Sequence, residues 1–214
     1  MAIVRSKFVG ALCALCLVAP GVAAPASAPA PLSAADLATV GQATAYLQGL
    51  SSARAHFIQT DARGATSQGE FLLQRPGKAR FAYAPPSGLV IASNGHVVSV
   101  LDARLNTFQS YPLGMTPLAL FLSKEIRLDR GVLVTKVAPT AEGFSILARD
   151  GRRRSEGQIA LFFGRSPLSL LGWTVTDAQG GSTRVRLLDL AAAGPFDARL
   201  FTLQPPRPKP EAQP

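Results

Sequence analysis

The sequence predicts a mainly β protein built from antiparallel strands. From Ala53 onward, about eleven short runs alternate apolar and polar residues, with glycine, proline, asparagine or aspartate between them. Most of these connections have hairpin length, which favours antiparallel pairing between neighbours in sequence. The 19 glycines and 17 prolines among the 214 residues are typical of such a turn-rich fold.

Residues 1–24 have the pattern of an export leader. Arg5 and Lys7 form a charged start, an apolar stretch follows, and small residues precede the expected cut. The apolar stretch is too short to span a bilayer. We therefore expect an exported protein. Its parts are a loose spacer over residues 25–32, a single domain over 33–206 and a proline-rich tail over 207–214.

Composition excludes several function classes. Cys13 and Cys16 both lie in the leader, so the exported chain has no thiol for disulfides, thiolate catalysis or zinc binding.

The chain carries 22 Lys and Arg against 13 Asp and Glu, a formal charge of +9. No recognition helix or aromatic and basic motif accompanies this charge, so we expect no nucleic-acid partner. An anionic partner or membrane surface fits it better.

One amphipathic helix is expected before the strands. Ser33 is a good N-cap, and Asp36 stands three residues later. Apolar positions then recur at helical spacing, at Leu37, Val40, Thr44, Leu47 and Leu50. The helix therefore needs an apolar surface to cover.

The predicted strands follow the helix almost to the end of the chain. The clearest turn is Asn94-Gly95. The strands are expected at residues 53–60, 66–75, 79–84, 88–93, 96–101, 105–111, 132–138, 143–149, 157–163, 171–177 and 182–189, with 200–204 as a further candidate.

A second helical segment interrupts the strands. Thr116 is an N-cap followed by Pro117 at the first helical position, and an almost wholly apolar run continues over residues 118–122. Two interpretations stay open, a buried crossover helix and a lid over an apolar cavity.

The sequence contains few groups that suit catalysis. It has no His-Glu-x-x-His, Gly-x-Ser-x-Gly or phosphate-binding Gly-Lys-Ser/Thr motif. His56 and His96 have no evident third metal ligand, and the carboxylates fall mainly in turns. We therefore expect no enzyme, no metal and no cofactor. The run from Arg152 to Arg154 fits either a solvated loop or a docking patch.

Arg75 departs from the pattern of its strand. It is in phase with Phe71 and Leu73, which alternation places on the apolar face. A guanidinium in an apolar cavity costs several kcal/mol unless its donors are satisfied. Arg75 should therefore be hydrogen-bonded there, unless the strand ends early enough for its side chain to reach solvent.

Several short motifs are spread along the mature chain. They are Phe57 with Gln59, Gly69-Glu70-Phe71, Arg75-Pro76-Gly77-Lys78, Arg80-Phe81-Ala82-Tyr83, Pro86, Ser93-Asn94-Gly95, Thr116-Pro117 and the closing segment Phe201-Thr202-Leu203-Gln204-Pro205-Pro206. In this order and spacing they resemble the periplasmic outer-membrane lipoprotein carrier family, LolA.

The resemblance implies an unclosed antiparallel β-barrel of about eleven strands, with helices that cover its concave apolar face. It also implies a monomeric periplasmic carrier of triacylated lipoproteins. Such a carrier receives its cargo from an inner-membrane lipoprotein-releasing ABC transporter and delivers it to an outer-membrane lipoprotein receptor. Burial of acyl chains at about 0.8 kcal/mol per CH₂ explains why these lipids need a carrier to cross water.

The resemblance also assigns a role to one residue. Arg75 would be the latch that bonds to backbone of the covering helices and holds the empty carrier shut. The expected acyl-chain cavity comprises Phe57, Phe71, Leu73, Phe81 and Tyr83, and the expected lid Met115, Leu118, Phe121 and Leu122. Each apolar residue is equally compatible with an ordinary core position.

Three alternatives remain. A carrier of another lipid and an envelope-stress sensor domain would both share this fold. An exported hydrolase would need a nucleophile motif, which the sequence lacks.

Overall fold

A single antiparallel sheet of eleven strands forms the protein, as the sequence and the family resemblance predicted. The computed structural model describes residues 31–116, 119, 122–126, 132–150 and 157–206. The predicted leader, most of the spacer, the tail and Arg152 to Arg154 lie outside these ranges. In space the strand order is β6-β5-β4-β3-β2-β1-β11-β10-β9-β8-β7, so β6 and β7 are the two edges and the sheet is not closed.

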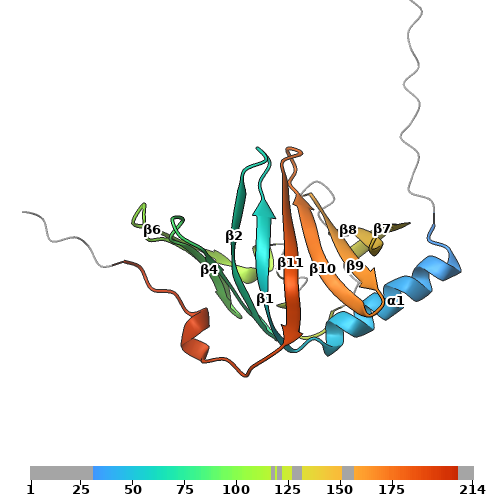
Figure 1. The fold of residues 1–214 in the computed structure, drawn as a ribbon, viewed down its shortest axis with the longest axis horizontal. Coiled ribbons are helices and arrows are strands. Elements are labelled where there is room, and N and C mark those ends of the chain that lie inside the picture. The colour runs from blue at the N-terminus through green and yellow to red at the C-terminus, as the bar shows by residue number, and fades with distance from the viewer. Residues whose placement is uncertain (1–30, 117–118, 120–121, 127–131, 151–156, 207–214) are drawn as a thin grey trace, which may run out of the picture.

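Nine of the ten pairings between neighbouring strands in this order join strands that are consecutive in sequence, and the tenth pairs β1 with β11 at the centre of the sheet. Figure 1 shows the sheet bent around this central pair. The bounds are β1 Ser52–Thr60, β2 Thr66–Gln74, β3 Lys78–Tyr83, β4 Leu89–Asn94, β5 Val97–Asp102, β6 Thr107–Pro112, β7 Val132–Pro139, β8 Gly143–Asp150, β9 Gln158–Arg165, β10 Leu168–Thr176 and β11 Ser182–Ala192.

Helix α1, Ala34–Gly49, precedes the sheet and packs on β7 and β10 (Figure 1). Ser33 and Asp36 form the predicted capping box. The buried face comprises Val40, Ala43 and Leu47, whereas Leu37 is 58% exposed, so its prediction as a packing residue was wrong. None of the helices in the described ranges combines the length and the hydropathy that a membrane span requires.

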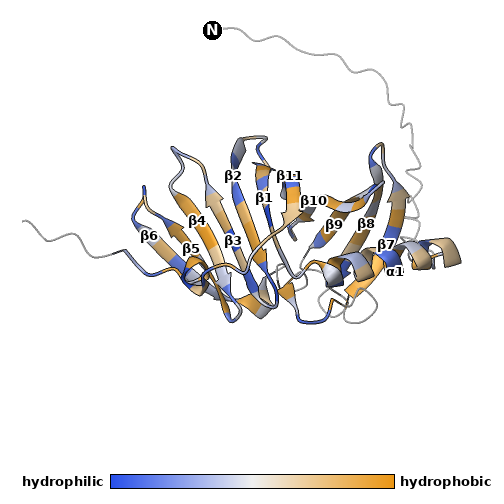
Figure 2. Cartoon of the chain, turned by 60° about the horizontal axis from the view of Figure 1, so that its bottom comes forward, coloured by the Kyte–Doolittle hydropathy of each residue, from blue (hydrophilic) through white to orange (hydrophobic). Residues whose placement is uncertain are grey.

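The two faces of the sheet differ in polarity. Alternation along each strand sends one set of side chains to an inner face, where α1 and Leu122 join them in one apolar cluster. Apolar and polar residues alternate along the strands in Figure 2. β2 shows this pattern directly, because Phe71 and Leu73 are buried while Glu70 is exposed.

A β-bulge in β10 changes which residues face inward. The pairing of β10 with β9 shifts between Leu170 and Gly172, and both Leu170 and Trp173 are buried. Regular alternation would place these two residues on opposite faces. Gly172 has a φ of +148°, and a Cβ atom there would lie 2.1 Å from the carbonyl oxygen of Val185, so only glycine fits.

The C-terminal segment does not form the strand predicted over residues 200–204. A 3₁₀ helix, Ala198–Phe201, lies there and packs on β3 and β4. Both strands are already paired on each side, so they offer no free backbone edge to a further strand. The Arg80 side chain, whose neighbour Phe81 faces inward, donates to the Leu200 carbonyl at 2.9 Å and holds the segment on the outer face.

Leu47 and Leu37 allow a matched test of how α1 packs. Leu47→Ala removes a buried side chain and should lower the free energy of unfolding by about 2–5 kcal/mol. Leu37→Ala changes an exposed position on the same helix and should change it by less than about 0.5 kcal/mol. Urea unfolding followed by circular dichroism measures both values. Equal losses in the two variants would contradict the observed orientation of the helix.

Candidate functional site

The predicted cavity residues lie together on the inner face, in a compact aromatic cluster. The Phe57 ring centre lies 5.0 Å from that of Tyr83 and 5.5 Å from that of Phe81, both in edge-to-face geometry. Phe71 lies 4.8 Å from Phe81, and Leu73 is 1% exposed. Three adjacent strands, β1, β2 and β3, supply all five side chains.

Trp173 completes this cluster and was missed at the sequence level. Its ring centre is 6.0 Å from that of Phe71 and 6.1 Å from that of Phe81. It belongs to β10, on the other side of the central pair, so the cluster joins the two halves of the sheet. The bulge at Gly172 changes the alternation of inward and outward side chains in β10. Strand alternation alone therefore does not predict that Trp173 faces inward.

The predicted lid residues have different placements. Leu122 is 2% exposed and belongs to the inner cluster. Met115 lies in a 3₁₀ helix, Leu113–Met115, and is 69% exposed, so it does not contribute to the apolar interior in this structure. Leu118 and Phe121 lie outside the described residues. The predicted N-cap, Thr116, donates its hydroxyl to the Leu113 carbonyl at 2.8 Å.

Arg75 contacts the backbone of two segments that cover the inner face. Its Nη1 donates to the carbonyl of Leu47 in the last turn of α1, and its Nη2 donates to the Ser123 carbonyl at 3.0 Å. Nη2 also lies 3.5 Å from the Lys124 carbonyl. One guanidinium therefore joins the end of β2, the end of α1 and the segment 122–126.

Gln48 makes a second connection between the same segments. Its Nε2 donates to the Lys124 carbonyl at 3.0 Å, and its Oε1 accepts from the Ile126 amide at 2.9 Å. The Gly77 amide adds a third contact, a 2.7 Å hydrogen bond to the Leu122 carbonyl. Sequence patterns do not single out Gln48, because a glutamine in the last turn of a helix is usually solvated. Arg75, Gln48 and Gly77 form what we call the polar closure.

The acceptors around Arg75 are all neutral among the residues described. They are three backbone carbonyls and, at 3.4 Å, the Gln48 side-chain oxygen. Burial lowers the pKa of Arg75 from its usual value. Its Nε is buried and has no hydrogen-bond partner among the residues that the structure describes. The charge is thus only partly compensated, so the closed arrangement is less stable than one with a carboxylate partner.

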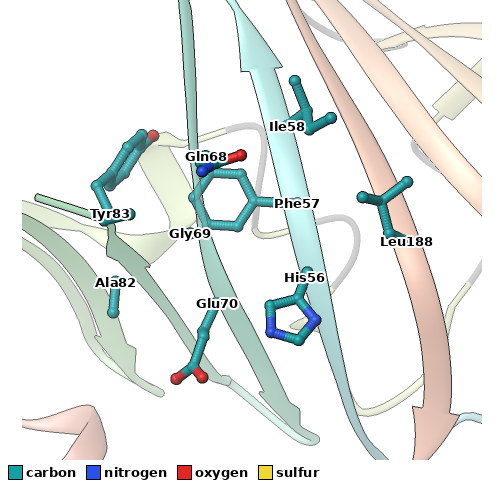
Figure 3. Close-up of a pocket in the computed structure, with 10 residues that line it drawn as sticks. His56, Phe57, Ile58, Gln68, Gly69, Glu70, Ala82, Tyr83 and Leu188 are labelled. Carbon is teal, nitrogen blue, oxygen red and sulfur yellow. The ribbon is translucent and has the colours of Figure 1, made fainter.

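The outer face carries a separate group of polar residues. Figure 3 shows His56 and Glu70 on the adjacent strands β1 and β2, in an open groove of about 590 Å³ that Ile58 and Leu188 also line. A bulge in β11 gives Asp189 a φ of +50°, and its carboxylate accepts from both the His56 amide and Nδ1 at 2.8 Å. Within the described ranges, His, Asp and Glu form no group that could hold a metal.

The ion pair between His56 and Asp189 should make folding stability depend on pH. The hydrogen bond to the Asp189 carboxylate and its charge raise the pKa of His56 above 6.5. Hydrogen bonds from the His56 backbone amide and then from its ring lower the pKa of Asp189 below 3.8. The histidine's contribution is complete below its ordinary pKa and is lost as the pH rises through the raised pKa. The aspartate's contribution is complete above its ordinary pKa and is lost as the pH falls through the lowered pKa.

We therefore expect Asp189→Asn to bring the pKa of His56 down toward 6.5. The stability difference between wild type and variant should shrink as the pH rises above the wild-type His56 pKa. Proton NMR titration gives the pKa, with His96 as the other histidine resonance. An unchanged His56 titration would show that the pair does not persist in solution.

Comparison with known proteins identifies the family. A sequence model described as outer membrane lipoprotein carrier protein LolA matches residues 48–204, a range that contains the aromatic cluster and the polar closure. A curated outer-membrane lipoprotein carrier protein of Methylococcus capsulatus is 31% identical over 144 residues, which cover 65% of this chain and 68% of the relative. One from Cupriavidus necator is 25% identical over 186 residues, which cover 81% and 87%.

A solved structure of a LolA superfamily protein from Nitrosomonas europaea aligns with 76% of this chain and 97% of its own, at 9% identity and a TM-score of 0.42. The family match over residues 48–204 rests on sequence and does not depend on this alignment. The chain belongs to the outer membrane lipoprotein carrier family, LolA.

Proposed function

We propose that this protein is a periplasmic carrier that binds triacylated lipoproteins without catalysis and moves them between the two membranes. It would take them from an inner-membrane lipoprotein-releasing ABC transporter and deliver them to an outer-membrane lipoprotein receptor. The observation that carries the proposal is the polar closure over an apolar inner face. Family membership supports the lipoprotein cargo.

The inner face supplies the hydrophobic environment that acyl chains need. Phe57, Phe71 and Leu73 are almost completely buried beneath α1 and Leu122. Acyl chains can reach these side chains only if the covering segments move away from the sheet. Binding would replace contacts between protein side chains with contacts to lipid, so its net free energy is smaller than the burial of the chains alone.

The polar closure would set the affinity for lipid. Opening breaks the hydrogen bonds of Arg75 to Leu47 and Ser123, and these bonds form again when the cargo leaves. Each intramolecular hydrogen bond contributes about 0.5–1.5 kcal/mol. Closure thus opposes lipid binding by a few kcal/mol and allows release to a receptor. Arg75 acts as a positioning residue for the covering segments.

Arg75→Leu tests this role. The variant should fold, bind a triacylated cysteinyl peptide about tenfold more tightly or better, and transfer lipoproteins poorly to outer membranes. Arg80→Leu is the matched control, because Arg80 is also a partly buried arginine that donates to a backbone carbonyl, but on the outer face. The control should transfer normally.

Release of newly made lipoproteins from spheroplasts, followed by transfer to outer membranes, gives the readout. Soluble complexes of one protein with one lipoprotein support the carrier function. Normal transfer by Arg75→Leu would contradict the role of the closure. Without any release, a different lipid found by mass spectrometry would indicate another cargo, and a stably bound regulatory polypeptide would indicate a sensor.

A further inference from the structure

The inner face has a second polar region, at the end of the strands away from Arg75. β1 runs toward the hairpin tip that joins it to β2, and β2 returns from that tip to Arg75. Near the tips lies a pocket of about 210 Å³, which we call the rim pocket. The residues that line it include Gln59, Phe81, Tyr83, Trp173 and Asp177.

The floor of the rim pocket is apolar and continues into the aromatic cluster. Phe81 and Trp173 line the pocket and also pack on Phe71 within the cluster. Phe81 and Trp173 are each 7% exposed. An acyl chain that displaced the covering segments could therefore continue from the cluster into this pocket without crossing a polar barrier. The group at the end of that chain would then meet the rim.

The rim presents hydrogen-bond donors. The Tyr83 hydroxyl donates to the Gln59 Oε1 at 2.7 Å, which fixes the orientation of the amide. Burial raises the pKa of Tyr83 to about 12, so the hydroxyl stays protonated and keeps this acceptor occupied. The Gln59 Nε2 has no hydrogen-bond partner in the described part of the chain. Its two N–H groups are available to a carbonyl oxygen.

The charge of the rim is negative. Asp177 is the one charged residue among those that line the pocket in the described ranges. Its Oδ1 accepts from the Gln179 amide at 2.9 Å and the Gly181 amide at 2.7 Å, which fixes the carboxylate in the hairpin between β10 and β11. A phosphate in the rim pocket would meet this carboxylate, and none of the described lining residues would offer it a cationic side chain.

We propose that the rim pocket holds the uncharged ester or amide linkage at the polar end of an acyl chain. Gln59 donates to the carbonyl, and Asp177 disfavours a phosphate. This inference rests on the proposed function and assigns it a selectivity. The carrier accepts acyl chains attached through neutral linkages, as in an acylated cysteine, and discriminates against anionic phospholipids.

The single tryptophan of the chain, Trp173, lines the rim pocket and reports binding by its fluorescence. Dioctanoylglycerol and dioctanoylphosphatidylglycerol, titrated below their micelle concentrations, differ in the charged group. The wild type should bind the neutral lipid more tightly. Asp177→Asn keeps the Oδ1 acceptor and removes the charge, so it should strengthen binding of the anionic lipid by about fivefold at low salt and leave the neutral lipid within about twofold.

Asp61→Asn is the matched control for the charge. Asp61 caps the hairpin between β1 and β2 through the same pattern, with hydrogen bonds of 2.9 Å from the Arg63 and Ala65 amides, but does not line the pocket. The control should change neither affinity. Equal effects of Asp61→Asn and Asp177→Asn would overturn the role of Asp177.

Gln59→Leu tests the donor. It should weaken binding of dioctanoylglycerol about 2- to 10-fold and leave binding of octylbenzene, which has no carbonyl, unchanged. Gln68→Leu, on the outer side of β2, is its control. Unchanged dioctanoylglycerol binding by Gln59→Leu would overturn the donor role.

The wild type separates the two proposals. If it binds no lipid at all, the proposed carrier function is wrong. If it binds both lipids equally, only the selectivity fails.

Discussion

An open sheet with one apolar face must have that face covered in water, and this constraint determines much of the structure. A closed barrel buries its interior with its own strands, whereas here β6 and β7 remain separate edges. α1 and the segment around Leu122 provide the cover instead. They are bound by packing and a few polar contacts, and the proposed carrier function requires that this cover separate from the sheet while the strand hydrogen bonds persist.

The polar groups of the inner face lie at its two ends. At one end, Arg75 and Gln48 bond to backbone carbonyls and amides of the covering segments. At the other end, Gln59 and Tyr83 bond to each other at the rim. The aromatic cluster lies between the ends, and its members other than Tyr83 and Trp173 have no polar side-chain atoms. This distribution suits a ligand with long apolar chains and a small neutral polar end.

The strands and the inward phase of Arg75 could be predicted because alternation survives along β2. Phe71, Leu73 and Arg75 follow one another at a spacing of two, and the structure directs all three toward the covered face. The N-terminal helix was predictable from the capping box of Ser33 and Asp36. Both signals depend only on residues that are close in sequence, so a single sequence is enough to predict them.

The missed features depend on long-range geometry. Trp173 faces inward because a bulge at Gly172 resets the alternation, and a bulge is visible only in the pairing with a neighbour. Gln48 matters because of Lys124 and Ile126, far away in sequence. Met115 was assigned from its apolar character, which does not fix its burial. The prediction of a strand over residues 200–204 was wrong because β3 and β4, on which this segment packs, have no free backbone edge.

The most direct test of the central claim is hydrogen exchange at two amides of the polar closure. The Gly77 amide donates to the Leu122 carbonyl at 2.7 Å and the Ile126 amide to the Gln48 Oε1 at 2.9 Å, so both are protected only while the cover is in place. Addition of a triacylated cysteinyl peptide should accelerate exchange at both amides and leave the central β1 and β11 amides protected. Unchanged or slower exchange at Gly77 and Ile126 in the loaded protein would contradict an opening closure.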